Sequence, residues 1–205
     1  MAARIAADLA LRPEVTSHWF EESACAGMTV GALTRHLVSQ WSNAVHLLEA
    51  PAGGEPISVW EHYERAKWAH TTLDDAANAG IREGSEELAA EGPETMRALV
   101  EELAPQLDAV LAAVPVVGRR GSVLIPWQGW SLSVNDFLLT RAMEVVVHSD
   151  DLAASVGLET PTFPDDVVGP VLDLLTGLSV RRHGSTALVR ALTRPQRAPS
   201  SVTAF

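Results

Sequence analysis

Apolar residues recur at intervals of three and four along most of the chain, and this spacing limits the fold more than any other feature. Between Val30 and Leu48 the apolar positions follow one face of a helix: Val30, Leu33, Leu37, Trp41, Ala44 and Leu48. Thr29 precedes this stretch as a candidate N-cap, and the Pro- and Gly-containing segment 51–54 follows it. We therefore predict an amphipathic helix here.

A second helix is predicted after this break. Ser58 and Glu61 form a capping box. The helix is expected to continue to about Gly80, and its apolar stripe comprises Tyr63, Ala66, His70, Leu73 and Ala77. The segment between Gly80 and Pro93 is rich in alanine and glutamate and is expected to be partly helical.

A third helix is predicted from Met96 to Val114, with Pro105 as a kink. Its apolar positions are Met96, Leu99, Leu103, Leu107, Val110 and Val114. The helical spacing of apolar residues is lost between Pro115 and Trp130, where short apolar groups stand among glycines and prolines. We interpret that stretch as an extended connection that could include a short pair of strands.

Three helices are expected in the remainder of the chain. Ser133, with Asp136 three residues later, opens a long one that ends at Gly157. The others run from Thr162 to about Arg182, before Gly184, and from Ser185 to Thr193. Helices joined by short connections predict an all-α bundle over residues 1–160 and a short helical extension over 161–205, packed on the bundle.

Composition excludes several classes of protein. A net charge of −11 makes nucleic acid an unexpected partner, although five arginines near the end of the chain (Arg181, Arg182, Arg190, Arg194 and Arg197) could hold a small anion. No apolar run approaches the roughly 20 residues that cross a bilayer, and the N-terminus lacks the features of a signal peptide. A cytoplasmic protein is expected. Cys25 is the single cysteine, so neither an internal disulfide nor a thiolate zinc cluster is possible.

The strongest candidate site is on the helix predicted after Ser133. Glu144 and His148 are four residues apart, so both side chains leave one face of the helix and could bind a divalent metal together. His36 is the best candidate for a third ligand, because it lies at the edge of the buried face of its own helix. A mostly polar stripe that includes His36, Gln40 and Asn43 is typical of a pocket wall. Three protein ligands and an open position are typical of catalytic metal sites.

A purely structural interpretation competes with this one. Arg141 could pair with Glu144, and His148 could be a hydrogen-bonded core histidine. The strongly apolar neighbours of Glu144 favour the metal site, because a buried carboxylate needs a charged partner or a metal.

The remaining candidates are weaker. His62 or His70 could be a fourth ligand or line the pocket, but core or surface roles are favoured. Trp127 and Trp130 could cover the site or be core aromatics. Cys25 has no basic neighbour in sequence and is not expected to be a nucleophile.

The same residues carry a family likeness. The segment Met28-Thr-Val-Gly-Ala-Leu-Thr-Arg-His36 resembles the opening motif of the DinB-like metalloenzyme superfamily. The segment Arg141-Ala-Met-Glu-Val-Val-Val-His-Ser-Asp-Asp-Leu152 resembles the metal-binding domain of mycothiol-dependent maleylpyruvate isomerases from actinobacteria. The C-terminal segment 183–199 is similar to the ends of short actinobacterial members.

This resemblance implies a four-helix bundle in which two histidines and a glutamate hold a divalent metal, usually zinc. The corresponding residues are His36, Glu144 and His148. The sequence departs from the family pattern at Met28, where tryptophan is usual, and at Ala32, where aspartate is frequent. Characterised isomerases continue into a sterol-carrier-like domain, for which the residues before Phe205 leave no room, so maleylpyruvate isomerisation itself is not expected.

We therefore expect a metalloenzyme that uses a small thiol such as mycothiol to conjugate or isomerise a small electrophile, as a monomer or homodimer. A divalent metal, zinc in the first place and otherwise nickel, iron or manganese, would lower the pKa of the thiol. Asp151 could orient His148, and Arg141 could pair with Glu144 or with a substrate carboxylate. The alternatives are a metal-dependent hydrolase, a non-enzymatic metal-binding stress-response protein, and a plain helical bundle.

Overall fold

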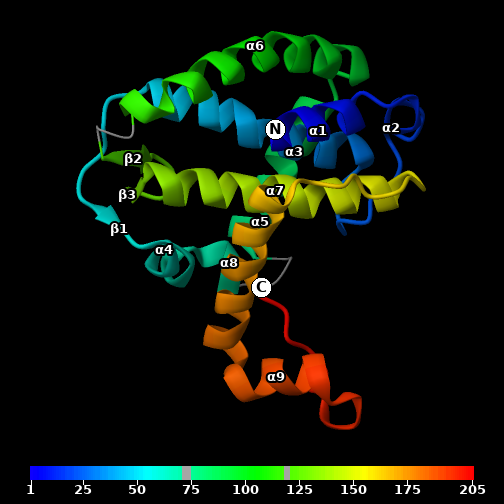
Figure 1. Cartoon of the computed structure of the whole chain (residues 1–205). Coiled ribbons are helices and arrows are strands. Elements are labelled where there is room, and N and C mark those ends of the chain that lie inside the picture. The colour runs from blue at the N-terminus through cyan, green and yellow to red at the C-terminus, as the bar shows by residue number, and fades with distance from the viewer. Residues whose placement is uncertain (71–74, 118–120) are drawn as a thin grey trace. The chain divides into compact units, whose positions relative to one another are not determined.

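The computed structural model describes residues 1–70, 75–117 and 121–205, and the chain divides into two compact units, Met1–Pro164 and Asp165–Phe205. The fold is helical with one small sheet, so the prediction of an all-α protein is confirmed (Figure 1). Leu73 and the side chains of Ala77 and Val114 belong to the predicted apolar stripes, and the side chains of Val116 and Val117 belong to the predicted extended connection. All five lie outside the described residues.

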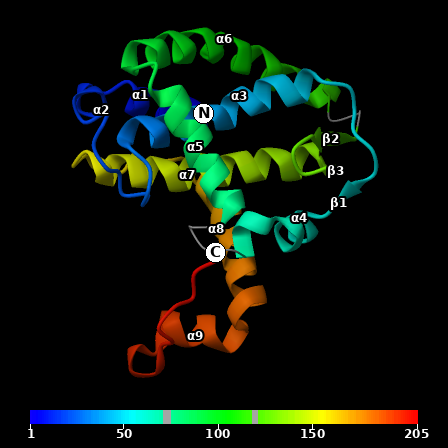
Figure 2. The ribbon, with the colours of Figure 1, turned by 180° about the vertical axis from the view of Figure 1, so that it is seen from behind.

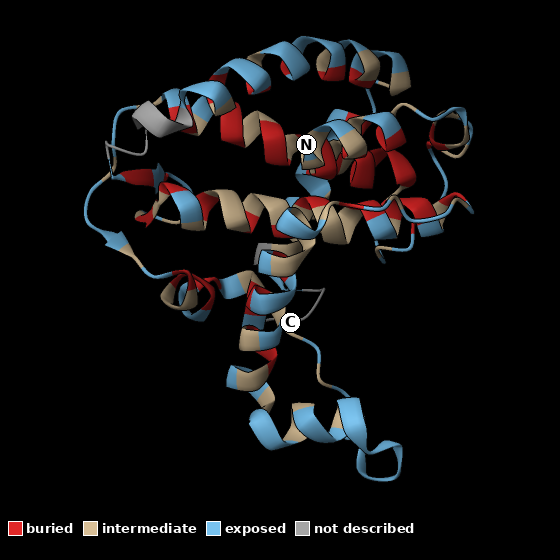
Figure 3. Ribbon diagram, viewed as in Figure 1, coloured by how far each residue is buried: buried red, intermediate tan, exposed pale blue. Residues whose placement is uncertain are grey.

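The first unit is built around α3 (Val30–Glu49), which packs against α5 (Ala76–Ala89), α6 (Pro93–Val117) and α7 (Val134–Ser155). The colours of Figure 1 show that α3 and α7 run in opposite directions, and Figure 2 shows α5 lying across α3. Two short helices precede the bundle, α1 (Ala2–Ala10), which packs on α7, and α2 (Pro13–Ser17). Figure 3 shows buried residues on the faces that α3 and α7 turn inward.

The N-terminus of α3 is fixed by three contacts. Thr29 caps the helix by accepting a hydrogen bond from the Ala32 amide, as its sequence position predicts. Glu86 of α5 accepts hydrogen bonds from the Thr29 amide (2.6 Å) and hydroxyl (2.9 Å). Trp19 lies against Gly31, where a Cβ atom would come within 2.6 Å of the indole. These contacts set where α3, and with it His36, lies relative to α5.

The predicted helix from Ser58 to Gly80 is wrong as a single element. The structure has α4 (Val59–Arg65), the 3₁₀ helix η1 (Lys67–His70) and then α5, which begins at Ala76. Ser58 does cap α4 by accepting from the Glu61 amide. The backbone turns extended at Ala66, and the His70 ring bonds back to the Tyr63 carbonyl (2.8 Å), so tertiary contacts override the continuous apolar stripe.

The connection before α7 is partly as predicted. Strands β2 (Ser122–Ile125) and β3 (Trp130–Ser133) form the expected antiparallel pair. A third strand, β1 (Pro56–Ile57), pairs in parallel with β3 and was not predicted, because two residues carry no detectable period. The extended conformation expected from Pro115 onwards is wrong at its start, since α6 continues through Pro105 and Pro115 to Val117.

Helix α7 begins as predicted, with the Ser133 hydroxyl accepting from the Asp136 amide. Its last helical residue is Ser155, and Gly157 follows with a φ of 68°, a conformation that glycine adopts without strain.

In the second unit, α8 (Asp165–His183) is followed by α9 (Ser185–Thr193) and η3 (Pro195–Arg197). The tail then returns to α8, where Ser179 donates to the Val202 carbonyl (2.6 Å). The expected packing of residues 161–205 on the bundle stays a prediction.

None of the helices in the described part of the chain combines the length and the apolar character that a membrane span requires.

Candidate metal centre

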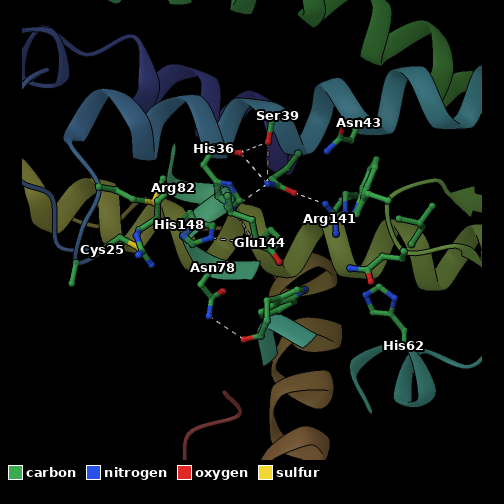
Figure 4. A pocket seen from close by; sticks show the side chains of 18 residues that line it. Cys25, His36, Ser39, Asn43, His62, Asn78, Arg82, Arg141, Glu144 and His148 are labelled. Atoms are coloured by element: carbon green, nitrogen blue, oxygen red, sulfur yellow. Dashed lines mark hydrogen bonds and ion pairs between the residues drawn. The ribbon is translucent and has the colours of Figure 1, made fainter. Parts of the chain in front are cut away.

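The facing surfaces of α3 and α7 bring His36, Glu144 and His148 together (Figure 4). Oε2 of Glu144 lies 3.1 Å from Nε2 of His148 and 3.6 Å from Nε2 of His36. The two imidazole rings meet edge to face with centroids 4.8 Å apart. All three side chains are largely buried, with 13–19% of their surface exposed. The helical spacing of Glu144 and His148 and the antiparallel packing of α3 and α7 produce this arrangement.

The donor atoms fit a divalent metal. Bonds of about 2.1 Å to imidazole nitrogen and carboxylate oxygen at tetrahedral angles place two ligand atoms roughly 3.4 Å apart. The observed separations of 3.1 and 3.6 Å bracket this value. A set of two nitrogens and one oxygen also suits zinc, nickel, iron and manganese alike, so the donor set does not select one metal.

Glu144 and His148 form a buried ion pair. Burial alone would raise the pKa of Glu144, but hydrogen bonds from His148 and His36 and the charges of His148 and Arg141 hold it well below its usual value. Burial likewise opposes the charged form of His148, yet hydrogen bonds to Asp151 and Glu144 raise its pKa to about 9. In the absence of a metal, an ionised carboxylate therefore holds a protonated imidazole. A metal ion would replace that proton.

Of two further predicted residues, Asp151 contacts this cluster directly and Arg141 reaches it through Gln40. Oδ2 of Asp151 lies 3.0 Å from Nδ1 of His148, the ring nitrogen that faces away from Glu144. Arg141 makes no ion pair with Glu144 within the described residues and instead donates to Oε1 of Gln40. Gln40 is buried, and its Nε2 lies 3.3 Å from Nε2 of His36. The purely structural interpretation proposed that Arg141 pairs with Glu144. The structure instead pairs Arg141 with Gln40.

The cluster opens into a cavity of about 420 Å³. Its wall includes the predicted residues Gln40, Asn43 and Arg141 in addition to the three candidate ligands. The other lining residues come from seven elements or loops: Cys25, Ala26, Met28, Ser39, His62, Trp68, Asn78, Ile81, Arg82, Ile125, Trp127 and Gln128. A cavity of this size accommodates a small organic ligand.

Sequence reasoning did not place Cys25 or Arg82 beside the cluster. The Cys25 sulfur, the His148 ring and the Asp151 carboxylate place one donor atom each within 4.8 Å of one another. Burial first, and then the charge of Asp151, raise the pKa of the Cys25 thiol, which agrees with the expectation that it is not a nucleophile. The Arg82 side chain of α5 packs against Gly27 in the loop before α3, where a Cβ atom would come within 3.2 Å of it. Gly27 has a φ of 80°. Neither contact has a signal in sequence spacing, because each depends on how a loop crosses a helix.

The weaker histidine and tryptophan candidates separate clearly. His62 lines the cavity, where its Nδ1 accepts a hydrogen bond from Nε1 of Trp130 (3.0 Å). Burial and then the charge of Arg141 lower the pKa of His62 to about 4, so this ring is neutral. His70 does not line the cavity. Trp127 lines the cavity with 57% of its surface exposed. Trp130 does not line the cavity, but its hydrogen bond holds the ring of His62, which does.

The fold and the site together define a helical bundle with a His–Glu–His cluster at the wall of a solvent-open cavity. The family model of the mycothiol maleylpyruvate isomerase N-terminal domain matches residues 2–153. The chain belongs to this family, and the predicted membership of the DinB-like superfamily is confirmed. Comparison with curated proteins and with solved structures gave no significant match. The match ends within α7, just beyond Asp151 and the cluster.

Proposed function

We propose that the protein is a divalent-metal-dependent enzyme that uses a low-molecular-weight thiol, of the mycothiol type, to conjugate or isomerise a small electrophile. The convergence of His36, Glu144 and His148 on one point of the cavity wall carries the proposal. Membership of a family named for a mycothiol-dependent isomerase supports the choice of thiol.

Each residue of the cluster has a separate task. His36, Glu144 and His148 would hold the metal, with Asp151 fixing the ring of His148. A divalent metal in this position favours the thiolate form of a neighbouring thiol at neutral pH. Asn43 offers an amide group to the thiol along the same wall, while the buried amide of Gln40 holds Arg141 and the His36 carbonyl in place.

The chemistry balances without an external oxidant or reductant. The thiol loses its proton, a C–S bond forms to the electrophile, and a proton is returned to the adjacent carbon in conjugation. In isomerisation the former double bond of the substrate rotates as a single bond while the thiol is attached. The C–S bond then breaks, the double bond forms again, and the thiol is released unchanged. The Arg141 guanidinium, which Gln40 and Thr140 hold by hydrogen bonds, lines the same cavity and would stabilise the negative charge that develops in either reaction.

The test is metal analysis of protein purified without a nickel column. Wild-type protein should contain about one divalent metal per chain, and His36→Ala and His148→Ala should lose most of it. His46→Ala removes an exposed histidine from the same helix as His36 and should retain the metal. Equal metal content in wild type and His148→Ala would overturn the assignment.

Thiol consumption then distinguishes the reactions. The proposal predicts metal-dependent loss of mycothiol with a model electrophile such as an α,β-unsaturated carboxylic acid, to which the thiol adds across the double bond, and this loss should be abolished in His148→Ala. Turnover of an ester without any thiol would identify a hydrolase instead. A tightly held metal without turnover across a panel of thiols and electrophiles would identify a metal-binding protein.

A further inference from the structure

The second unit contains a concave surface that the metal centre does not explain. A cavity of about 320 Å³ that is open to solvent lies along α9 and η3, and each residue that lines it is exposed. Three arginines and three hydroxyl residues form almost all of its lining, with one apolar residue: Ser185, Thr186, Val189, Arg190, Thr193, Arg194 and Arg197. Every lining residue belongs to the second unit, so the site is complete within it.

The charge of this unit is opposite to that of the rest of the chain. Residues 165–205 carry five arginines and three aspartates, a net charge of +2, whereas residues 1–164 carry 10 basic and 23 acidic residues, a net charge of −13. The three aspartates, Asp165, Asp166 and Asp173, lie in the first half of α8 and do not line the cavity. The arginines at the cavity therefore have no carboxylate beside them in its lining.

The arginine side chains are available to a ligand. Arg190 and Arg197 form no ion pair within the part of the chain that the structure describes, and Arg194 donates to the Thr193 carbonyl (2.7 Å). Guanidinium groups bind phosphate oxygens with two parallel hydrogen bonds, and several around one cavity attract a multiply charged anion.

The start of α9 adds donors of a second kind. Ser185 and Thr186 are the first two residues of the helix, and their amides have no carbonyl partner inside it. Gly184 occupies the N-cap and offers no side-chain acceptor to those amides. The cavity lining thus combines three guanidiniums with the hydroxyls of Ser185 and Thr186, which lie beside the first-turn amides of α9, whereas the Thr193 hydroxyl already donates to the Val189 carbonyl (2.6 Å).

We propose that the α9 cavity is a binding site for a phosphate-bearing ligand, either a soluble phosphate ester or a lipid phosphate headgroup. A tetrahedral dianion presents enough acceptor oxygens for the arginines and hydroxyls together. The volume leaves room for a small organic group beyond the phosphate. This site is independent of the metal centre, since no residue lines both cavities.

Calorimetric titration of the full-length protein with inorganic pyrophosphate tests the proposal in solution. One saturable site is expected, with affinity at least tenfold weaker in Arg190→Gln and in Arg197→Gln. Arg182→Gln is the matched control, because it removes the same charge from exposed α8 outside the cavity. Binding should persist in His148→Ala, which separates this site from the metal centre.

Sedimentation with vesicles tests the lipid source. Vesicles of phosphatidylcholine containing phosphatidic acid should bind the wild type more strongly than phosphatidylcholine alone if the ligand is a headgroup, and the Arg190 and Arg197 variants should lose this difference. Pyrophosphate binding without vesicle binding assigns a soluble ligand. Failure of both probes to bind saturably, or equal weakening by Arg182→Gln, would overturn the proposal. Circular dichroism and melting of each variant establish that the loss is not one of folding.

Discussion

His148 has a different partner on each of its ring nitrogens. Nε2 faces Glu144 and the candidate metal position, and Nδ1 faces Asp151 at 3.0 Å. A carboxylate on the outer nitrogen fixes the tautomer in which Nε2 carries the lone pair, and it makes that nitrogen more basic. Asp151 should therefore control metal affinity without binding the metal itself.

We predict that Asp151→Asn weakens metal binding by about 10- to 100-fold and leaves the fold intact. Competition with a chromophoric chelator measures this change. Asp150→Asn is the control, because Asp150 is the neighbouring carboxylate on α7 but is exposed and bonded to Thr160. The role assigned to Asp151 fails if both variants bind metal equally well.

His62 provides a pH-dependent prediction of stability. Its folded-state pKa of about 4 lies below the unfolded value of about 6.5, so both states are neutral above pH 6.5. As the pH falls from 6.5 towards 4, the unfolded state binds a proton that the folded state refuses. The free energy of unfolding should decline by about 3 kcal/mol over that window because of this residue.

Urea denaturation at pH 4.5 to 7.5 checks the slope. His62→Asn keeps an acceptor for Nε1 of Trp130 but does not titrate, so its profile should be flatter by the amount that His62 contributes. His46→Asn, at an exposed position, should keep the wild-type slope. Parallel profiles for wild type and His62→Asn would contradict the burial of a neutral ring.

Sequence periodicity was sufficient for some site residues and not for others. Glu144, His148 and Asp151 could be placed on one face because a single helix carries them. The positions of Cys25 and Arg82 at the cavity could not be predicted, because Cys25 lies in a loop and Arg82 on α5, and only tertiary packing brings them there. The partner of Arg141 was likewise uncertain, since Gln40 is 101 residues away in sequence.

At the scale of elements, contacts at the N-terminus of α3 position the helix that carries His36. Trp19 donates to the Ala89 carbonyl (2.9 Å) while its ring lies against Gly31, so one indole links the first turn of α3 to the end of α5. The break after Arg65 allows α5 to reach this position. No glycine or proline marks that break, which is why the apolar stripe predicted one long helix there.

We predict opposite effects for two glycine-to-alanine substitutions in helices. Gly31→Ala places a methyl group within 2.6 Å of the Trp19 ring and should cost about 1–3 kcal/mol of unfolding free energy. Gly84→Ala on α5 meets no atom within 4 Å and should stabilise by about 0.5–1 kcal/mol. Denaturant unfolding of both variants measures the difference. A neutral Gly31→Ala would show that Trp19 does not hold α3 in place.

At the scale of the whole molecule, the candidate ligands join the two antiparallel helices at the centre of the first unit. His36 lies on α3, and Glu144 and His148 lie on α7, so a bound metal would stabilise only the state in which these helices are packed. Such linkage contributes about 2.7 kcal/mol when the free metal concentration is 100 times the dissociation constant.

We predict that a strong chelator lowers the melting temperature of the wild type and that added metal restores it. His36→Ala should melt at the same temperature with and without chelator, because the metal can no longer connect α3 to α7. His46→Ala should respond like the wild type. Unchanged melting of the wild type after complete metal removal would mean that the ion pair of Glu144 with protonated His148 is sufficient to hold the two helices together. The cluster would then be a structural feature of the bundle, and the proposed thiol chemistry would lose its centre.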